Sequence, residues 1–291
     1  MTLASPGGGN TARAAEVNDV RARMLRVLLN SRLPFMVGGA YGFYALTGIA
    51  RFTKDFDVFI HPRDCDAVLS ALAGGGYPVE ATFPHWLGKA FADDAVLDVI
   101  WGAGNGMVRI DDGWFAHAIR GQALGLPVYF CPAEETIWSK AFIMERERFD
   151  GGDVVHLIQA RADTLDWRRL LDRFGPHWRI LLAHLVLFGF VFPGERSRVP
   201  AWVLRSLTER LAAERFCDAG GKLCQGTLLS REQYLVDVEC KGYEDARRPP
   251  RGTMTTDDIA RWTAAIQGRD IIDGLEADAA GEGDRPAGGR G

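Results

Sequence analysis

Two aspartates, Asp55 and Asp57, are the residues whose type and spacing best suit chemistry. They lie in the run Asp55-Phe-Asp-Val-Phe-Ile60, whose alternating pattern predicts a β-strand. Because side chains alternate across a strand, both carboxylates are expected on one face, about 7 Å apart along the chain. Magnesium is a natural partner, since it is held by one or two carboxylates together with substrate phosphates. Taken alone, such a pair is more often a solvated face.

A third carboxylate, Asp98, stands inside the apolar run Val96-Leu-Asp-Val-Ile100, which also predicts a strand. A charge in such surroundings is costly unless it has a partner. A metal ion shared with Asp55 and Asp57 would explain its presence, so we predict that the three carboxylates face one point.

A pair of glycines, Gly38 and Gly39, ends a short apolar strand at 34–37 and opens a helix at about 40–47. Backbone N–H groups of such a turn, together with the positive end of the helix, could cradle a phosphate. A Gly-Gly turn by itself is a weak signal. The combination is more specific: a strand, the Gly-Gly turn, a helix, the strand that carries Asp55 and Asp57, and a later strand that carries Asp98.

The segment VGGAYGFYALTGIARFTKDFDVFI, residues 37–60, resembles the motif of the polymerase-beta-type nucleotidyltransferase superfamily. That motif has Gly-[Gly/Ser], a spacer, and then Asp-x-[Asp/Glu] between apolar residues. The form with two glycines and with Arg51-x-Thr53 before the first Asp is similar to bacterial nucleotidyltransferase-like proteins and tRNA-tailing enzymes.

The resemblance implies roles for the residues that match the motif. Two Mg²⁺ ions, for which Mn²⁺ could substitute, would act in catalysis, and the ligands would be the catalytic carboxylates Asp55, Asp57 and Asp98. The nucleotide would be bound at the glycine turn and the residues just before the strand, namely Gly38, Gly39, Arg51 and Thr53.

A second block, residues 134–153, is similar to the Lys, Arg and Asp-x-x-Asp motif of the toxin-like bacterial branch. Lys140 stands among apolar residues, where a lysine either extends to solvent or meets an anion such as a triphosphate. This adds three nucleotide-binding candidates, Lys140, Arg148 and Asp150. Two alternatives stay open. Lys140, Arg146 and Arg148 could form helix-surface ion pairs with Glu145 and Glu147. Asp150 and Asp153 could instead be helix caps at the Gly151-Gly152 break.

Other chemically capable residues have simpler interpretations. His156, His184, Trp138 and Phe142 follow helical apolar patterns and are predicted to lie in the core. A basic run near Tyr243 could contact an RNA or nucleotide acceptor, although a solvated loop is the simpler reading; its arginines are Arg247, Arg248 and Arg251.

The elements that must position these residues change character once along the chain. Strands at about 34–37, 55–60, 77–83, 91–101 and 128–130 alternate with helices at 11–33, 40–47 and 64–73. After Pro132 the pattern is helical, at 134–148, 153–161, 167–174, 179–190 and 201–214. We therefore predict an α+β fold, with a nucleotidyltransferase-type mixed sheet at 11–131 and a helical domain at 132–273. Disordered tails are predicted at 1–10 and 274–291.

Composition narrows the classes of function. Lys and Arg total 34 against 38 Asp and Glu, so a global basic field is absent and DNA is not an expected partner. Five widely spaced cysteines without C-x-x-C argue against a disulfide framework or a zinc site. The N-terminus lacks the apolar core of a secretory signal, which predicts a cytoplasmic protein. The apolar stretch 180–192 is too short to span a bilayer, so no membrane partner is expected.

Together these features predict a magnesium-dependent nucleotidyltransferase that moves NMP from an NTP such as ATP to a hydroxyl-bearing acceptor. The acceptor is left open among RNA, protein and small molecules. The alternative is a catalytically silent protein of the same fold with a binding or regulatory role, such as one half of a toxin–antitoxin pair.

Overall fold

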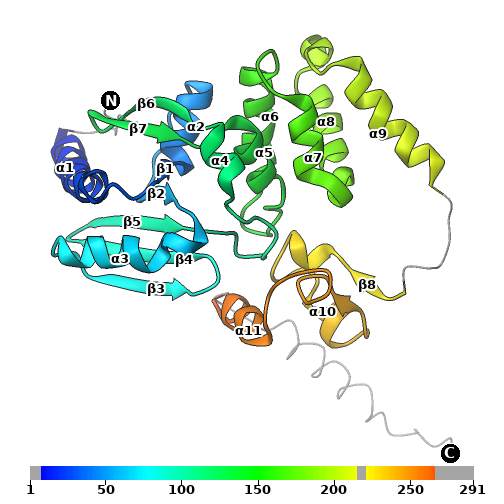
Figure 1. Ribbon diagram of the computed structural model, residues 1–291. Coiled ribbons are helices and arrows are strands. Elements are labelled where there is room, and N and C mark those ends of the chain that lie inside the picture. The colour runs from blue at the N-terminus through cyan, green and yellow to red at the C-terminus, as the bar shows by residue number, and fades with distance from the viewer. Residues whose placement is uncertain (1–7, 215–220, 266–291) are drawn as a thin grey trace, which may run out of the picture.

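The computed structural model describes residues 8–214 and 221–265 (Figure 1). Its centre is a mixed seven-stranded sheet in the order β3-β4-β5-β2-β1-β7-β6. The pairs β2–β5 and β1–β7 are parallel and the other neighbours are antiparallel. The strands are β1 Met36–Val37, β2 Asp55–Phe59, β3 Val79–Phe83, β4 Leu87–Ala92, β5 Ala95–Ile100, β6 Ile119–Ala123 and β7 Leu126–Phe130.

The two faces of this sheet are covered by different helices. On one face, Phe56 and Val58 of β2 belong to an apolar cluster with residues of α1 and α3. On the other face, Ile100 of β5 packs in a larger cluster with residues of α2, α4 and the later helices. The helices of the first part of the chain are α1 Gly8–Ser31, α2 Gly39–Thr47, α3 Cys65–Gly74 and α4 Asp112–Ala116.

Helices dominate after the last strand of the sheet, and Figure 1 shows them grouped beside it. They are α5 Ala133–Ala141, α6 Gly151–Arg161, α7 Trp167–Phe174, α8 Trp178–Val191 and α9 Ala201–Ala213. A last segment contains β8 Leu223–Cys224, α10 Leu235–Glu239, β9 Glu244–Asp245 and α11 Thr256–Ala264. It returns to the edge of the sheet, where the Trp262 ring of α11 lies 5.1 Å from Phe83 of β3.

This arrangement confirms the predicted α+β class, and most of the predicted helices and strands are present. The predicted single strand at 91–101 is wrong, because the chain turns at Asp93, with φ of 50°, and forms the hairpin β4–β5. The predicted helix at 134–148 is also too long. Helix α5 ends at Ala141, and residues 142–150 form a loop closed by the bridge between Met144 and Phe149.

The ends of the chain differ in part from the prediction. Helix α1 begins at Gly8, so residues 8–10 are helical rather than part of a tail. Residues 1–7 and the predicted tail at 274–291 lie outside the described residues. Four of the five cysteines are described, and all four are free.

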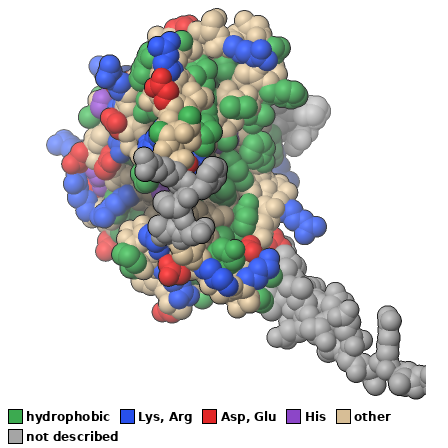
Figure 2. Space-filling model, turned by 90° about the vertical axis from the view of Figure 1, so that its right-hand side faces the viewer, with side chains coloured by type: hydrophobic (Ala, Val, Ile, Leu, Met, Phe, Trp, Pro, Cys, Tyr) green, Lys and Arg blue, Asp and Glu red, His purple; other side chains and the backbone are tan. Residues whose placement is uncertain are grey.

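Helix α8 is buried along one face only. Leu181, Leu185 and Phe188 are buried, whereas Phe190 is 80% exposed and Val186 is 64% exposed. Figure 2 views the side of the molecule on which α8 and α9 lie and shows apolar side chains at this surface. By length and composition, one stretch, Trp167–Val191, could cross a membrane, but it combines α7 and α8 across a 3₁₀ turn. Helix α8 alone, with 14 residues, is shorter than the roughly 20 needed.

Candidate functional site

The predicted carboxylates lie on two neighbouring strands. In the parallel register of β2 and β5, Asp57 is directly beside Asp98, and Asp55 is one pleat away on the same face. Burial raises the pKa of Asp57 to about 6, and the negative charges of Asp98 and Asp55 add to this shift. The three carboxyl groups therefore interact electrostatically.

A lysine missed by the sequence analysis occupies the space next to Asp98. Lys89 of β4 is opposite Asp98 in the antiparallel register, and its Nζ lies 2.8 Å from Asp98 Oδ1. Burial raises the pKa of Asp98, and the bond from Lys89 opposes this shift. A lone lysine within the otherwise uncharged strand Leu87–Ala92 was the signal that could have identified it.

This ion pair bears on the predicted metal site. Within residues 8–214 and 221–265, no three His, Cys, Asp or Glu side chains are close enough to hold a metal ion. The donor set still suits a hard cation, because Asp55, Asp57 and Asp98 share one face, and burial together with the charges of Asp98 and Asp55 raises the pKa of Asp57. To complete such a site, Asp98 would have to exchange Lys89 for the cation.

The glycine turn lies directly over Asp57. The Gly38 N–H donates to the Asp57 carbonyl oxygen at 3.1 Å, and Gly38 caps the N-terminus of α2. Gly39 has φ of 52°, and a Cβ at this position would overlap the Asp57 carboxylate. Glycine is therefore required here both by the backbone conformation and by the close approach of the carboxylate. The turn brings the positive end of α2 next to the acidic strand.

The residues before the strand are also placed close by. The Thr53 hydroxyl donates to the Asp55 carbonyl oxygen at 2.9 Å, which fixes the chain where it enters β2. The Arg51 guanidinium lies over the Phe43 ring of α2, 4.5 Å from its centre, and forms an ion pair with Asp153 of α6. Arg51 thus connects the first predicted block to the second.

The cations of the second block are held by aspartates. Lys140 Nζ lies 2.8 Å from one carboxylate oxygen of Asp150 and 2.8 Å from one of Asp153. Arg148 donates to both oxygens of Asp150, each at 2.9 Å. Burial favours the neutral form of Asp150, but the bonds from Arg148 and Lys140 outweigh it and lower the pKa of that carboxyl.

This network bears on the glutamate pairing and the helix cap, the two alternatives left open for the second block. The partner of Lys140 is the Asp150–Asp153 pair rather than a glutamate, and Glu145 instead accepts from Ser230 at 2.7 Å. Asp150 stands at the N-cap of α6, but its side chain makes no cap hydrogen bond. The charges of Lys140 and Arg148 lower the pKa of Asp57, so this basic cluster acts on the acidic strand.

The predicted core residues are mostly in the core. Trp138, Phe142 and His184 are buried, and Phe142 stacks on Phe174. The His184 ring bonds through Nε2 to the Ala141 carbonyl oxygen at 3.0 Å. His156 is partly buried and meets the edge of the Phe43 ring.

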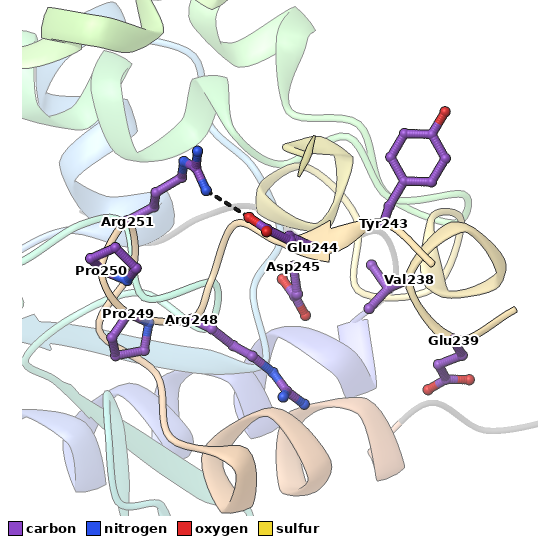
Figure 3. Close-up of a pocket in the computed structure, with 9 residues that line it drawn as sticks. All are labelled: Val238, Glu239, Tyr243, Glu244, Asp245, Arg248, Pro249, Pro250 and Arg251. Carbon is purple, nitrogen blue, oxygen red and sulfur yellow. Dashed lines mark hydrogen bonds and ion pairs between the residues drawn. The ribbon is translucent and has the colours of Figure 1, made fainter. Parts of the chain in front are cut away.

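The basic run near Tyr243 is largely occupied by its own ion pairs. Arg247, predicted as a contact for an acceptor, is 1% exposed and is paired with Asp245, so it is structural. Arg251 Nη1 lies 2.9 Å from Glu244 (Figure 3). Arg248 and Tyr243 line a pocket of about 470 Å³ and stay candidates for contact with an acceptor.

A buried ionic cluster at the start of α5 was not predicted. Glu135 is fully buried and accepts from Arg169 at 2.6 Å and from Arg173 at 2.9 Å, both on α7. Arg169 also pairs with Glu134. The sequence gave no indication that these glutamates are buried. Two adjacent acidic residues in the first turn of a helix predict only a favourable interaction with the helix dipole.

Comparisons with known proteins find distant similarity to solved structures. No protein-family model and no curated protein matches the chain. The solution structure of the antibiotic-resistance factor ANT(2'')-Ia is 17% identical, with a TM-score of 0.40, covering 58% of this chain and 97% of that one. A crystal structure of ANT(2'')-Ia with adenylyl-2''-tobramycin is 16% identical, with a TM-score of 0.36, covering 67% and 98%. JHP933 from Helicobacter pylori is 11% identical, with a TM-score of 0.36, covering 69% and 96%.

Proposed function

We propose that this protein is a metal-dependent nucleotidyltransferase that transfers NMP from an NTP to a hydroxyl-bearing acceptor. One observation carries the proposal: Asp57 lies beside Asp98 and beneath the Gly38–Gly39 turn, at the N-terminus of α2. Carboxylates for a cation and backbone donors for a phosphate thus meet at one place.

Each group of residues has a distinct part in the proposed reaction. The cation would be held by Asp55 and Asp57, and Asp98 would become a third ligand once its ion pair with Lys89 is broken. The bound cation would polarise the phosphates and neutralise their charge. The backbone N–H groups that follow Gly38 at the start of α2 would bind a phosphate oxygen, since the Gly38 N–H already donates to the Asp57 carbonyl oxygen. Lys140 and Arg148 exchange their aspartate partners for the β- and γ-phosphates, where their charge stabilises departing pyrophosphate.

Labelling tests this proposal. The protein is incubated with each α-labelled NTP, Mg²⁺ and total cell extract, and the extract is separated into RNA, protein and small molecules. We expect label in one fraction with the wild type and with Asp172→Asn, an exposed change on α7, and none with Asp57→Asn. Label transfer by Asp57→Asn would contradict the assignment, and the labelled fraction identifies the acceptor class.

A silent binding protein of the same fold is the second candidate, and the Lys89–Asp98 ion pair favours it. A lysine at this position supplies the positive charge that the metal would otherwise provide. Calorimetry separates the two candidates. For the enzyme, NTP binding strengthens with Mg²⁺ in the wild type and loses this dependence in Asp57→Asn; for the silent protein, NTP binding is independent of Mg²⁺.

A further inference from the structure

A cavity of about 540 Å³ lies between α1, α2 and the segment that enters β2. Its apolar lining comes from Val17 and Ala14 of α1, Val96 of β5 and the rings of Tyr41 and Phe52. Phe52 is 77% exposed, which is unusual for a phenylalanine. The volume falls within the range of pockets that hold small organic molecules.

The cavity also contains a buried guanidinium. Arg21 lines it and is only 4% exposed. Its Nη2 donates to the carbonyl oxygens of Thr53, at 3.4 Å, and Lys54, and its Nη1 to the Asn18 side chain at 3.4 Å. All of these acceptors are neutral. Within the described part of the chain, Arg21 forms no ion pair, and its buried Nε has no hydrogen-bond partner.

In the described part of the chain, none of the other charged residues around the cavity forms an ion pair with Arg21. Arg13 and Asp94 pair with each other at 2.6 Å on the exposed rim. Lys54 and Asp55 complete the charged lining. A buried charge without a counter-ion is costly, so it is retained where an anion from outside pairs with it.

We propose that this cavity binds a small organic oxyanion, a carboxylate or a phosphate carried on an aromatic or other apolar body, with Arg21 as the residue that pairs with the anion. The guanidinium suits both oxyanions, because it is permanently charged and Nη1 carries a second N–H beyond the one that reaches the Asn18 side chain. The rings of Tyr41 and Phe52 and the aliphatic side chains of α1 contact the apolar body. Its lining includes neither Lys140 nor Arg148, although it adjoins the proposed cation site through Thr53 and Asp55, and binding there requires no reaction.

Paired probes that differ in charge test this site in the full-length protein. Binding of phenyl phosphate and phenol, and of benzoate and benzyl alcohol, is measured by calorimetry, with inorganic phosphate as a further probe. We expect at least one charged aromatic probe to bind and the neutral partners not to bind. Preference between phenyl phosphate and benzoate identifies the oxyanion. Equal binding within each pair, or no binding of either charged probe, would overturn the proposal.

Variants locate the bound probe. We expect Arg21→Met to weaken binding about tenfold or more, in keeping with the loss of a charge-assisted hydrogen bond, and Arg205→Met, an exposed change on α9, to leave it unchanged. Ala14→Trp fills the cavity from the partly exposed side of α1 and should abolish binding without removing Arg21, even if Arg21→Met fails to fold. Arg148→Ala should have no effect. Loss of binding in Arg148→Ala alone would place the anion at the nucleotide cluster and refute the cavity site.

Discussion

Asp57 of β2 and Asp98 of β5 are direct neighbours in a parallel register, and each faces a different counter-charge. Asp98 is paired with Lys89 at 2.8 Å, whereas Asp57 is reached only by the more distant charges of Lys140 and Arg148. Burial, followed by the negative charges of Asp98 and Asp55, raises the pKa of Asp57 to about 6, so the ionisation of Asp57 weakens the fold.

The first prediction follows from this pKa. The folded-state value lies above the usual 3.8, so the folded protein binds the proton more tightly between about pH 4 and 6, and stability falls as the pH rises through this window. In EDTA at pH 7.5, Asp57→Asn should gain up to about 3 kcal/mol in free energy of unfolding, and this gain should vanish near pH 4. Urea denaturation at several pH values measures it. An equal gain in Asp172→Asn would attribute the effect to net charge instead.

The second prediction concerns Lys89. Lys89→Met removes the ammonium group that competes with Mg²⁺ for the Asp98 carboxylate. The metal-free variant should therefore be less stable than the metal-free wild type, and Mg²⁺ should stabilise the variant more strongly than it stabilises the wild type. Melting temperatures with and without Mg²⁺ measure both effects. Lys241→Met, which removes an exposed lysine paired with Asp237, is the control. A Mg²⁺ effect no larger than that of the wild type would argue that Asp98 takes no part in metal binding.

The third prediction concerns Lys140, whose side chain is 14% exposed and sits between two buried aspartates. Lys140→Met leaves these carboxylates short of positive charge and should cost about 3 kcal/mol at pH 7. The lowered pKa of Asp150 means that this stabilisation is present above the unfolded pKa and is lost as the pH falls through the folded one. The difference between variant and wild type should therefore shrink towards pH 3. A cost that persists in acid would indicate lost packing rather than lost charge.

The fourth prediction concerns the buried cluster on α5 and α7. Glu135→Ala leaves Arg169 and Arg173 without their shared carboxylate and should lower the free energy of unfolding by about 3–5 kcal/mol. Glu16→Ala, an exposed change on α1, should have little effect. Urea denaturation compares the two. Similar small losses in both variants would mean that water reaches Glu135.

Local patterns were sufficient for the acidic strand and the glycine turn. Alternation placed Asp55 and Asp57 on one face, and the two glycines marked the start of α2, because both features depend on residues close together in the chain. The hairpin before Asp98 was missed, since Asp93 adopts a left-handed conformation within a run that reads as continuous. Propensity alone does not reveal such a turn.

Long-range pairing could not be predicted. Lys89 and Asp98 pair across the short β4–β5 hairpin, so this pair was missed together with the turn at Asp93. Arg51, by contrast, meets Asp153 only because segments distant in sequence come together. The same holds for Arg21, which lies on α1 and donates to the carbonyl oxygens of Thr53 and Lys54. Residue type alone does not distinguish a buried arginine from an exposed one on an amphipathic helix.

The larger apolar cluster has a consequence for folding. It joins Met36 of the sheet and Phe43 of α2 to Leu157 of α6 and Leu181 of α8, so the sheet and the helices after Pro132 share one interior. A fragment ending at Cys131 would expose this interior to water and should fail to fold. The full chain should accordingly unfold in one cooperative transition. The backbone amides of β1 and α6 should therefore lose their protection from hydrogen exchange at the same denaturant concentration.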